Sequence, residues 1–515
     1  MMPFATISPT YESARLRRAQ ARGCCQKRGL VLQSAALVVS LIRMPGASAG
    51  HAFAAGEPSL EDVARRMRYW RGVAPDNLPA PDAQHARKYM LLEQDGAGVN
   101  NKRIGWEMAG VLALHTGRTL VLPPNDVWWA IDANGTTSKT EDFINLEQLR
   151  GGLPVLTFQE FAQKEQQALG LPDWTVNDKL EGAQKKSWTD FAMQNFKGPG
   201  DHHAEWCNVS SYLSDTSVLY INHYPKGRLL DCEQWWSIGE PQFTEGDKPW
   251  AVPNSTYSLL RNHFVWHKDV FELAAPIVKE LGLFKYVALH ARFNDFKEFD
   301  PQAVQSADGI LSMWARRGEV APATTDTALL QTSGRLFRRA VPISSIELDN
   351  AVHSAAQRSR ARAQTVLERI MHWVEPGTVM YISTDETDEN FLRTFKDHGI
   401  DARWSHDFFE KADSPIAQLV AKDPVRADKL RGCVEQVVCA FGRIFLGTSK
   451  STFSGYITRM RIYADAPQRG LNQTTRLFHT QAPSPEVEEA VQQEMADWEA
   501  RGAFSAIDKS SPGVF

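Results

Sequence analysis

Short apolar runs that end in polar, glycine-containing loops constrain the fold of this chain most strongly. The run YMLL (89–92) leads through GAGVNNKR (96–103) into a stretch with helical spacing from Ile104 to Gly117, and TLVLP (119–123) follows. A short uninterrupted apolar strand on each side of a helix is typical of a parallel sheet that is covered on both faces. This part of the chain therefore predicts a β-α-β unit.

The same pattern recurs in the second half of the chain. Apolar strands are predicted within YVALHARFNDF (286–296), TVMYIST (378–384) and RIFLG (443–447). Helical spacing predicts helices over 59–70, 345–373, 388–399, 429–441 and 452–463. The prediction is an α/β protein with two doubly wound halves, which bind ligands at the carboxyl ends of their strands or in a cleft between the halves.

The length of 515 residues also favours two domains, because one hydrophobic core rarely serves so many. The predicted N-terminal domain covers 85–283, although the sequence from strand 119–123 to Gly282 looks less regular. The predicted C-terminal domain covers 284–480 and contains a loop insertion at 300–345. A linker is expected at 75–82, and the tail 481–515 reads as an acidic helix with a polar end.

Residues 1–54 resemble a targeting segment. A basic stretch (15–28) precedes an apolar run, Leu30–Ile42, and small residues follow at 46–54. This order is that of a secretory signal, and the run is shorter than the ~20 residues of a membrane-spanning helix. We therefore expect a cleaved signal rather than a transmembrane helix, and a location in the lumen of the endoplasmic reticulum or Golgi. A transit peptide or a basic disordered tail remains open.

Other features fit a secreted protein without proving it. Four cysteines follow the leader, and Cys433 and Cys439 in one predicted helix would lie about 9 Å apart, too far for a disulfide. Cys207–Cys232 is the favoured pair, and four reduced thiols are the alternative. The four Asn-X-Ser/Thr sequons lie at Asn134, Asn208, Asn254 and Asn472.

Composition excludes some partners. The formal net charge of −4 does not favour nucleic acid as a partner. The histidines and cysteine of DHHAEWC (201–207) match no standard zinc spacing, so no metal site is predicted. The tryptophan pairs at 128–129 and 235–236 could stack on sugars or fill the core.

Four polar loops follow predicted strands and are the candidates for a site. In the first, Gly96 and Gly98 permit a tight turn before a helix N-terminus. Its other polar residues, Asn100, Asn101, Lys102 and Arg103, would add hydrogen-bond donors and positive charge. The loop is either an anion or sugar-phosphate site or an ordinary strand–helix turn.

The second loop, LHARFNDF, brings His290, Arg292 and Asp295 off the end of a strand. Arg292 could bind a diphosphate with two hydrogen bonds and be oriented by Asp295. The alternative is a structural ion pair with a buried histidine.

The third and fourth loops are ISTDETDE (382–389) and GTSKSTFSG (447–455). Asp385 either caps the following helix or accepts hydrogen bonds from a purine. Ser449, Ser451 and Thr452 either form an anion-binding turn or cap the next helix. A nucleotide sugar needs diphosphate, base and sugar contacts together, which four such loops could supply.

These motifs, taken in order, resemble those of the GDP-fucose protein O-fucosyltransferase family. The matching stretches are YMLLEQDGAGVNNKR, TEDFINLEQLRGGLPVLTFQEF (140–161), HARFNDF, YISTDE and EQVVCAFGRIFLGTSKSTFSGYITRMR. The likeness covers roughly 88–463 and is poor over 163–260 and 300–345. GTSKSTFSG is most similar to the members that act on thrombospondin-type repeats.

The resemblance implies a GT-B fold with the active site between two Rossmann-like domains. It implies GDP-fucose as the donor, inversion at the fucose anomeric carbon, and no metal or cofactor. Asn100 would face the sugar and a protein acceptor, and Arg292 would stabilise the leaving β-phosphate. The implied GDP-fucose-binding residues are Gly96, Gly98, Asn101, His290, Asp295, Asp385, Ser449, Ser451, Thr452 and Phe453.

The sequence departs from the family pattern at two points. Ala97 stands where the thrombospondin-repeat enzymes have a glutamate proposed as the general base, a carboxylate that the enzymes acting on EGF-like repeats also lack. Phe293 replaces a second cation beside Arg292. Glu93 and Asp95 are substitute bases to consider. The alternatives are a related transferase with another sugar nucleotide or a glycan acceptor, and a catalytically silent nucleotide-sugar-binding protein.

Overall fold

Two parallel sheets organise the chain in the computed structural model. The first sheet contains β1 (Tyr89–Leu92), β2 (Thr119–Val121), β3 (Val155–Leu156) and β4 (Val218–Ile221), in the order β3-β2-β1-β4. All of its pairings are parallel. The second sheet has the order β11-β10-β7-β8-β9 and is also parallel throughout. Its strands are β7 (Val287–Ala291), β8 (Val379–Thr384), β9 (Asp401–Trp404), β10 (Ile444–Thr448) and β11 (Thr475–Phe478).

The structure describes eleven stretches of the chain, and every structural statement below refers to them. They are residues 58–70, 87–93, 98–128, 131–132, 137–176, 183–198, 207–222, 243–293, 345–448, 451–464 and 474–478, with only the backbone described over 345–354. The predictions for the leader, the linker, the insertion before residue 345, the tail, Trp129, Trp235, Trp236, Asn134, Asn472 and residues 201–206 lie outside these stretches.

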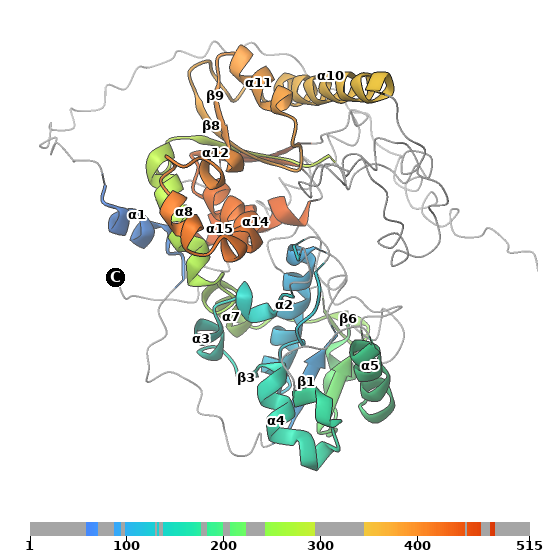
Figure 1. The fold of residues 1–515 in the computed structure, drawn as a ribbon. Coiled ribbons are helices and arrows are strands. Elements are labelled where there is room, and N and C mark those ends of the chain that lie inside the picture. The colour runs from blue at the N-terminus through green and yellow to red at the C-terminus, as the bar shows by residue number, and fades with distance from the viewer. Residues whose placement is uncertain are drawn as a thin grey trace, which may run out of the picture. The chain divides into compact units, whose positions relative to one another are not determined.

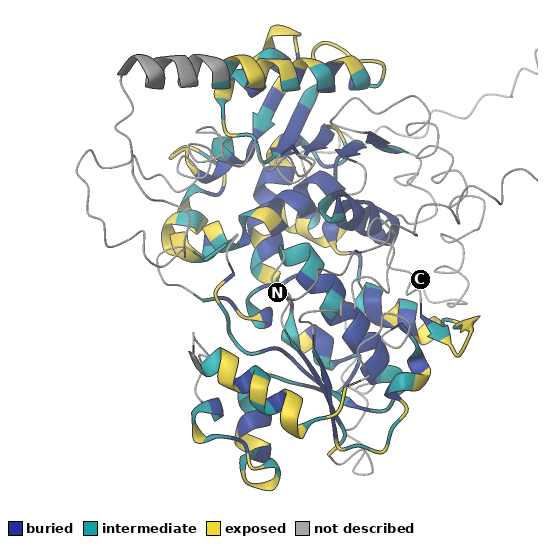
Figure 2. Cartoon of the chain, turned by 90° about the vertical axis from the view of Figure 1, so that its right-hand side faces the viewer, coloured by how far each residue is buried: buried dark blue, intermediate teal, exposed yellow. Residues whose placement is uncertain are grey.

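Alternating side chains explain why both faces of each sheet are covered. Tyr89 and Leu91 of β1 pack into one core with α4 and α5, whereas Met90 and Leu92 pack into another with α2. In the second sheet, Val287 and similar residues meet α10 and α11. Figure 1 shows α10 and α11 beside β8 and β9, and Figure 2 shows buried strands with exposed residues on the outer helices. The predicted α/β class with two doubly wound sheets is confirmed.

The helices connect successive parallel strands. In the first part of the chain they are α1 (Leu60–Met67), α2 (Val99–His115), α3 (Leu146–Arg150), α4 (Phe158–Leu169), α5 (Ala183–Asn195), α7 (Asn254–Asn262) and α8 (Lys268–Leu281). In the second part they are α10 (Ser345–Ile370), α11 (Glu389–Asp397), α12 (Ser405–Phe409), α13 (Ala417–Lys422), α14 (Pro424–Ala440) and α15 (Thr452–Ala464). Short 3₁₀ helices (η3 Thr140–Asp142, η4 Asp173–Val176, η5 Val209–Tyr212) and a small hairpin (β5 Thr244–Glu245, β6 Lys248–Pro249) complete the described elements.

The less regular region before Gly282 is more ordered than its sequence indicates. It contains α8, whose apolar residues are buried in the same core as α14, and strand β4, which pairs with β1. Strands β9 and β11 were not predicted either. The predicted strands and helices of the second half are confirmed within a few residues.

Of the described cysteines, one is disulfide-bonded and two are free thiols, as the sequence predicts. Cys207 is disulfide-bonded, so the alternative of four reduced thiols is wrong, and its predicted partner Cys232 lies outside the described stretches. Cys433 and Cys439 are buried free thiols, as their separation predicts. Among the helices searched in the described part, none is both long and apolar enough to cross a membrane.

Candidate active site

Two helix N-termini meet at the centre of the candidate site. Hydrogen bonds and ion pairs join Asn101 to Thr452 and Glu107 to Arg459, and the Arg103 guanidinium lies 4.3 Å from the Tyr456 ring centroid. The partners advance in the same direction along both helices, so α2 and α15 run parallel with their N-termini together. Two positive helix ends at one place favour an anionic ligand and repel each other without one.

The first polar loop differs from the prediction where it enters α2. The helix begins at Val99 rather than Ile104, with Gly98 as its N-cap, and Asn100 and Asn101 lie in its first turn. Lys102 and Arg103 are 3% and 1% exposed. Lys102 Nζ lies 5.0 Å over the ring of Trp128, and Arg103 pairs with Glu107. The charge of Arg103 is thus compensated by Glu107 within α2 rather than offered to the loop, and Lys102 is buried over Trp128.

Tryptophan 128 belongs to the core. Trp128 is 2% exposed and stacks on Phe143 at a centroid distance of 4.7 Å. The core role, rather than sugar stacking, is the one that the structure supports for this residue.

The hydroxyl of Thr448 forms hydrogen bonds to the end of β7, where Arg292 begins the second polar loop. Thr448, the last residue of β10, accepts a hydrogen bond from the Arg292 backbone N at 2.9 Å and donates one to the His290 carbonyl at 3.0 Å. Since β7 and β10 are the neighbours at which the strand order reverses, this point is the ligand-binding crevice expected of an open parallel sheet.

Asp385, at the end of the adjacent strand β8, orients the same loop. One of its carboxylate oxygens accepts a hydrogen bond from the Phe293 backbone N at 3.0 Å, and the other lies 3.5 Å from Arg292 Nε. The Asp385 side chain is 8% exposed and that of Arg292 is 31% exposed. Arg292 thus faces a carboxylate from β8, whereas Asp295, the partner expected from the sequence, lies outside the described stretches.

His290 forms the buried support of the fourth loop. Its ring stacks on Phe453 at 4.4 Å, and its Nδ1 lies 2.8 Å from the Ser454 hydroxyl. Burial, with a further contribution from the positive charge of Arg292, lowers the pKa of His290 to about 3. The imidazole is therefore neutral at physiological pH and adds no charge beside Arg292.

The first turn of α15 carries the other predicted residues of this loop. Ser451 is 8% exposed, and its carbonyl accepts a hydrogen bond from Gly455 N at 2.9 Å, which places it at the N-cap position. The structure therefore brings together Asn100, Asn101, His290, Arg292, Asp385, Ser451, Thr452 and Phe453 from segments far apart in the sequence. Gly98 lies at the start of α2, and Gly96, Ala97, Asp295 and Ser449 lie outside the described stretches.

Two residues of the site have no clear sequence signal. Thr448 lies inside a quoted motif, but only the sheet shows that its hydroxyl joins β10 to the end of β7. Gln436 lies near the C-terminal end of α14 and contacts both Asn100 and the Phe453 carbonyl. A polar residue within a helix gives no indication of a partner 336 positions away.

The described residues near the site offer no evident base. Glu93 accepts a hydrogen bond from the Thr189 hydroxyl of α5 at 3.1 Å, on the face of the sheet opposite α2. Among the described residues, no group of three or more His, Cys, Asp or Glu side chains could hold a metal ion. Arg292 and the N-termini of α2 and α15 are the positive groups that the described residues place at the candidate site.

Comparison with known proteins assigns the family. A family model described as GDP-fucose protein O-fucosyltransferase matches residues 89–464, well over half of the chain. The chain belongs to this family. The match begins at β1 and ends at the last residue of α15, so it spans all of the site residues above. The family is one of glycosyltransferases that transfer fucose from GDP-fucose, and no curated protein matches this sequence.

Solved fucosyltransferase structures are similar at low sequence identity. POFUT1 in complex with GDP is 16% identical, with 76% of this chain and 98% of that chain covered and a TM-score of 0.36. NodZ α-1,6-fucosyltransferase co-crystallised with GDP is 10% identical, with 72% and 91% covered and a TM-score of 0.31. NodZ from Bradyrhizobium is 11% identical, with 73% and 93% covered and a TM-score of 0.32.

Proposed function

We propose that this protein is an inverting, metal-independent fucosyltransferase that moves fucose from GDP-fucose to a Ser or Thr hydroxyl of a protein. The observation that carries the proposal is the meeting of three positive groups: Arg292 at the end of β7 and the N-termini of α2 and α15. The charge that develops on a departing nucleoside diphosphate requires such preorganised positive groups. Family membership supports GDP-fucose as the source of that diphosphate.

In the proposed reaction the acceptor oxygen attacks the anomeric carbon of fucose while the bond from that carbon to the β-phosphate oxygen breaks. The electron pair of that bond leaves with GDP, and the proton of the acceptor hydroxyl is released to solvent, so the products are the fucosylated acceptor, GDP and a proton. Arg292 stabilises the leaving phosphate, held in place by Asp385 and Thr448. Asn100 faces the sugar and acceptor, and Asp385 also recognises guanine. The GDP-fucose-binding set further includes Gly96, Gly98, Asn101, His290, Asp295, Ser449, Ser451, Thr452 and Phe453.

Two finer parts of the proposal concern the acceptor and the compartment. We propose a folded, disulfide-rich repeat of the thrombospondin type as acceptor, on the likeness of GTSKSTFSG, and the lumen of the secretory pathway as location. The disulfide at Cys207 supports an oxidising compartment. Expression of the full chain in eukaryotic cells, with N-terminal sequencing and cell fractionation, tests this. Accumulation of uncleaved protein in the cytosol would contradict it.

The activity test combines purified protein, GDP-fucose and folded thrombospondin-type or EGF-like domains, with mass spectrometry of the acceptor. Arg292→Ala should lower turnover by about 10²–10³, the usual effect of losing one stabilising group at a developing oxyanion. Arg403→Ala is the matched control, because Arg403 pairs with Asp401 and Glu280 on the surface near β9. Turnover of Arg292→Ala within a few-fold of the wild type would refute the assigned role.

A catalytically silent GDP-sugar-binding protein is the second candidate. It is favoured by Ala97 at the position of the proposed glutamate base and by the engagement of Glu93 with Thr189. Tight GDP binding measured by calorimetry, without transfer to any folded repeat and without slow hydrolysis of GDP-fucose, would support this candidate over the transferase. Transfer from another GDP-sugar or to a glycan would instead support a related transferase.

A further inference from the structure

Gln436 of α14 contacts the N-terminal turns of both α2 and α15 with its side-chain amide. Its side-chain Nε2 lies 2.9 Å from Asn100 Oδ1 in α2 and 3.3 Å from the Phe453 carbonyl oxygen in α15. Gln436 is 1% exposed, so these contacts are shielded from water. The residue is therefore placed where it can determine how Asn100 presents its own amide.

The backbone carbonyl of Phe453 determines the orientation of the side-chain amides of Gln436 and Asn100. A carbonyl only accepts hydrogen bonds, so the group of Gln436 beside it must be the NH₂. The same NH₂ lies beside Asn100, which must therefore turn its Oδ1 toward Gln436. The Nδ2 of Asn100 then faces away from Gln436 with both of its N–H donors.

This orientation leaves one acceptor of Gln436 unpaired. Among the described residues, Gln436 Oε1 is buried without a hydrogen-bond partner. A buried unpaired acceptor is destabilising, and such groups in native proteins call for an explanation. The arrangement is explained if the orientation of Asn100 matters more to the protein than the full pairing of Gln436.

We infer that Gln436 is a positioning residue that makes Asn100 a hydrogen-bond donor to the ligand. Asn100 Nδ2 donates to an oxygen of the bound donor or acceptor, such as a phosphate, sugar or hydroxyl oxygen. The identity of that oxygen rests on the proposed function, whereas the orientation of the two amides does not.

The first test measures orientation by stability alone. Urea denaturation is compared for the wild type, Gln436→Met, Asn100→Ala, Asn100→Asp and the two double variants that combine Gln436→Met with each substitution of Asn100. Asn100→Asp keeps a side-chain oxygen that can accept from Gln436 and has no NH₂. The coupling free energy between the aspartate and Gln436 should therefore be at least as large as that between Asn100 and Gln436, with Asn100→Ala as the reference for both. The double-variant cycle cancels the effect of a new charge at the start of α2. Loss or reversal of the coupling in the Asn100→Asp background would overturn the inference.

The second test measures turnover in the full-length protein. Gln436→Met should lower kcat about 10-fold, the effect of one misplaced neutral hydrogen bond, and should also lower the urea midpoint, because Asn100 Oδ1 and the Phe453 carbonyl both lose a donor. In an Asn100→Ala background, the same substitution should change kcat no further. An equal loss of kcat in both backgrounds would show that Gln436 does not act through Asn100.

A matched control separates positioning from ordinary support. Gln148 is 8% exposed, and its Nε2 donates to the Asn262 carbonyl at 2.6 Å. Gln148→Met should lower the urea midpoint and leave kcat unchanged, whereas Gln436→Met should lower both. If the wild type transfers no fucose but the stability coupling holds, the proposed function fails and the amide orientation stands. Transfer without the coupling refutes the orientation.

Discussion

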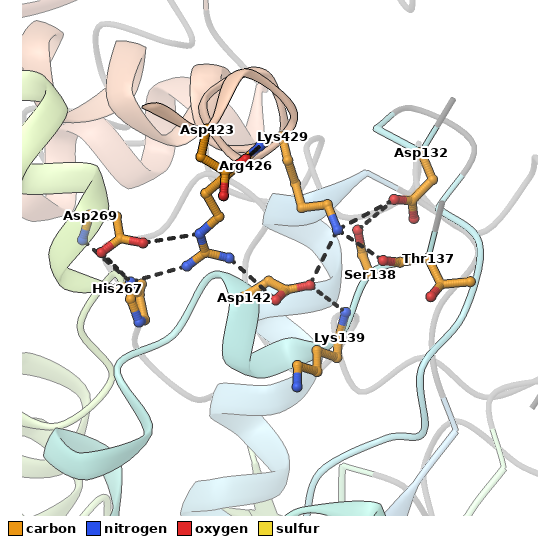
Figure 3. Close-up of polar contacts among 10 residues, drawn as sticks. All are labelled: Asp132, Thr137, Ser138, Lys139, Asp142, His267, Asp269, Asp423, Arg426 and Lys429. Carbon is orange, nitrogen blue, oxygen red and sulfur yellow. Dashed lines mark hydrogen bonds and ion pairs between the residues drawn. The ribbon is translucent and has the colours of Figure 1, made fainter. Parts of the chain in front are cut away.

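Two charged contacts join the region of α2 to the helices of the second sheet, and they differ in their access to water. The buried triad consists of Arg103, Glu107 and Arg459. The α14 cluster consists of Asp132, Asp142, His267, Asp269, Arg426 and Lys429, which Figure 3 shows below the first turns of α14.

The buried triad lies between α2 and α15, one to two turns beyond the site. Arg103 Nε lies 2.9 Å from Glu107 Oε1, and Arg459 donates to the other oxygen of the same carboxylate. All three side chains are at most 2% exposed. The Arg103 guanidinium also lies 3.9 Å from the Trp266 ring centroid. One carboxylate therefore serves two guanidinium groups with almost no water present.

The α14 cluster is partly open to solvent. Arg426 lies 3.2 Å from Asp142 and 3.0 Å from Asp269, and these side chains are 17–30% exposed. Lys429 donates to the Thr137 carbonyl at 2.9 Å and reaches Asp142 at 3.4 Å. Water and salt screen such pairs, so each contributes modestly to stability.

The buried triad and the α14 cluster differ in how strongly they should hold the helices of the candidate site together. Removing Glu107 from the triad leaves two buried guanidinium groups without a counter-charge, whereas water can reach the partly exposed ion pairs of Arg426 in the α14 cluster. The triad also joins the same two helices whose N-termini carry Asn100, Asn101 and Thr452. We therefore expect the triad to hold α2 parallel to α15, and the α14 cluster to add a weaker, salt-sensitive contact.

The largest effect is expected from Glu107→Gln. It leaves Arg103 and Arg459 buried without a counter-charge, so the free energy of unfolding should fall by about 3–5 kcal/mol in urea denaturation. Replacing all three members with apolar residues (Arg103→Met, Glu107→Leu and Arg459→Met) should recover most of that loss. If the Glu107→Gln variant were as stable as the wild type, the buried triad would not contribute more to stability than the α14 cluster.

An intermediate effect is expected on acidification. The unfolded His290 has the ordinary pKa of about 6.5, whereas in the fold it is about 3. Between these values the unfolded state binds the extra proton, so stability is lost as the pH falls. This residue alone should account for about 2 kcal/mol between pH 8 and pH 5. His290→Asn should make the unfolding free energy less dependent on pH over this range.

His267 gives the matching measurement in the α14 cluster. Its Nδ1 accepts a hydrogen bond from Arg426, and burial, offset in part by Asp269, lowers its pKa. Stability from this residue is likewise lost as the pH falls below about 6.5. His267→Asn should reduce the pH dependence less than His290→Asn. If His267→Asn reduced the pH dependence of the unfolding free energy more than His290→Asn, the environment of His267 would disfavour the protonated imidazole more strongly than that of His290.

The smallest effect is expected from Arg426→Ala. The free energy of unfolding should fall by about 1 kcal/mol at low salt, and by less in 1 M NaCl, because partly exposed ion pairs are screened. Arg393→Ala on α11 is the control, since the described part of the chain records no ion pair for it. A loss at Arg426 that does not depend on salt would place this contact with the buried triad.

Much of the fold is predictable because strand and helix patterns are local. The runs at 89–92, 378–384 and 443–447 became β1, β8 and β10. Strands β9 and β11 were not predicted because their four residues mix polar and apolar side chains, and β4 was not predicted because it lies in the stretch whose sequence looks less regular. The start of α2 was misplaced because glycine and asparagine indicate a turn locally, whereas packing against α15 extends the helix to Val99.

Local sequence was enough to predict the parallel α/β class, the family and the loops of the candidate site. These follow from apolar runs and from motifs a few residues long. Packing in three dimensions was needed to show that Arg103 is buried against Glu107, that Lys102 is buried over Trp128, and that the Gln436 amide lies beside that of Asn100. Such choices depend on contacts in the folded chain, where burial and hydrogen bonding, rather than local pattern, select each side chain's partner.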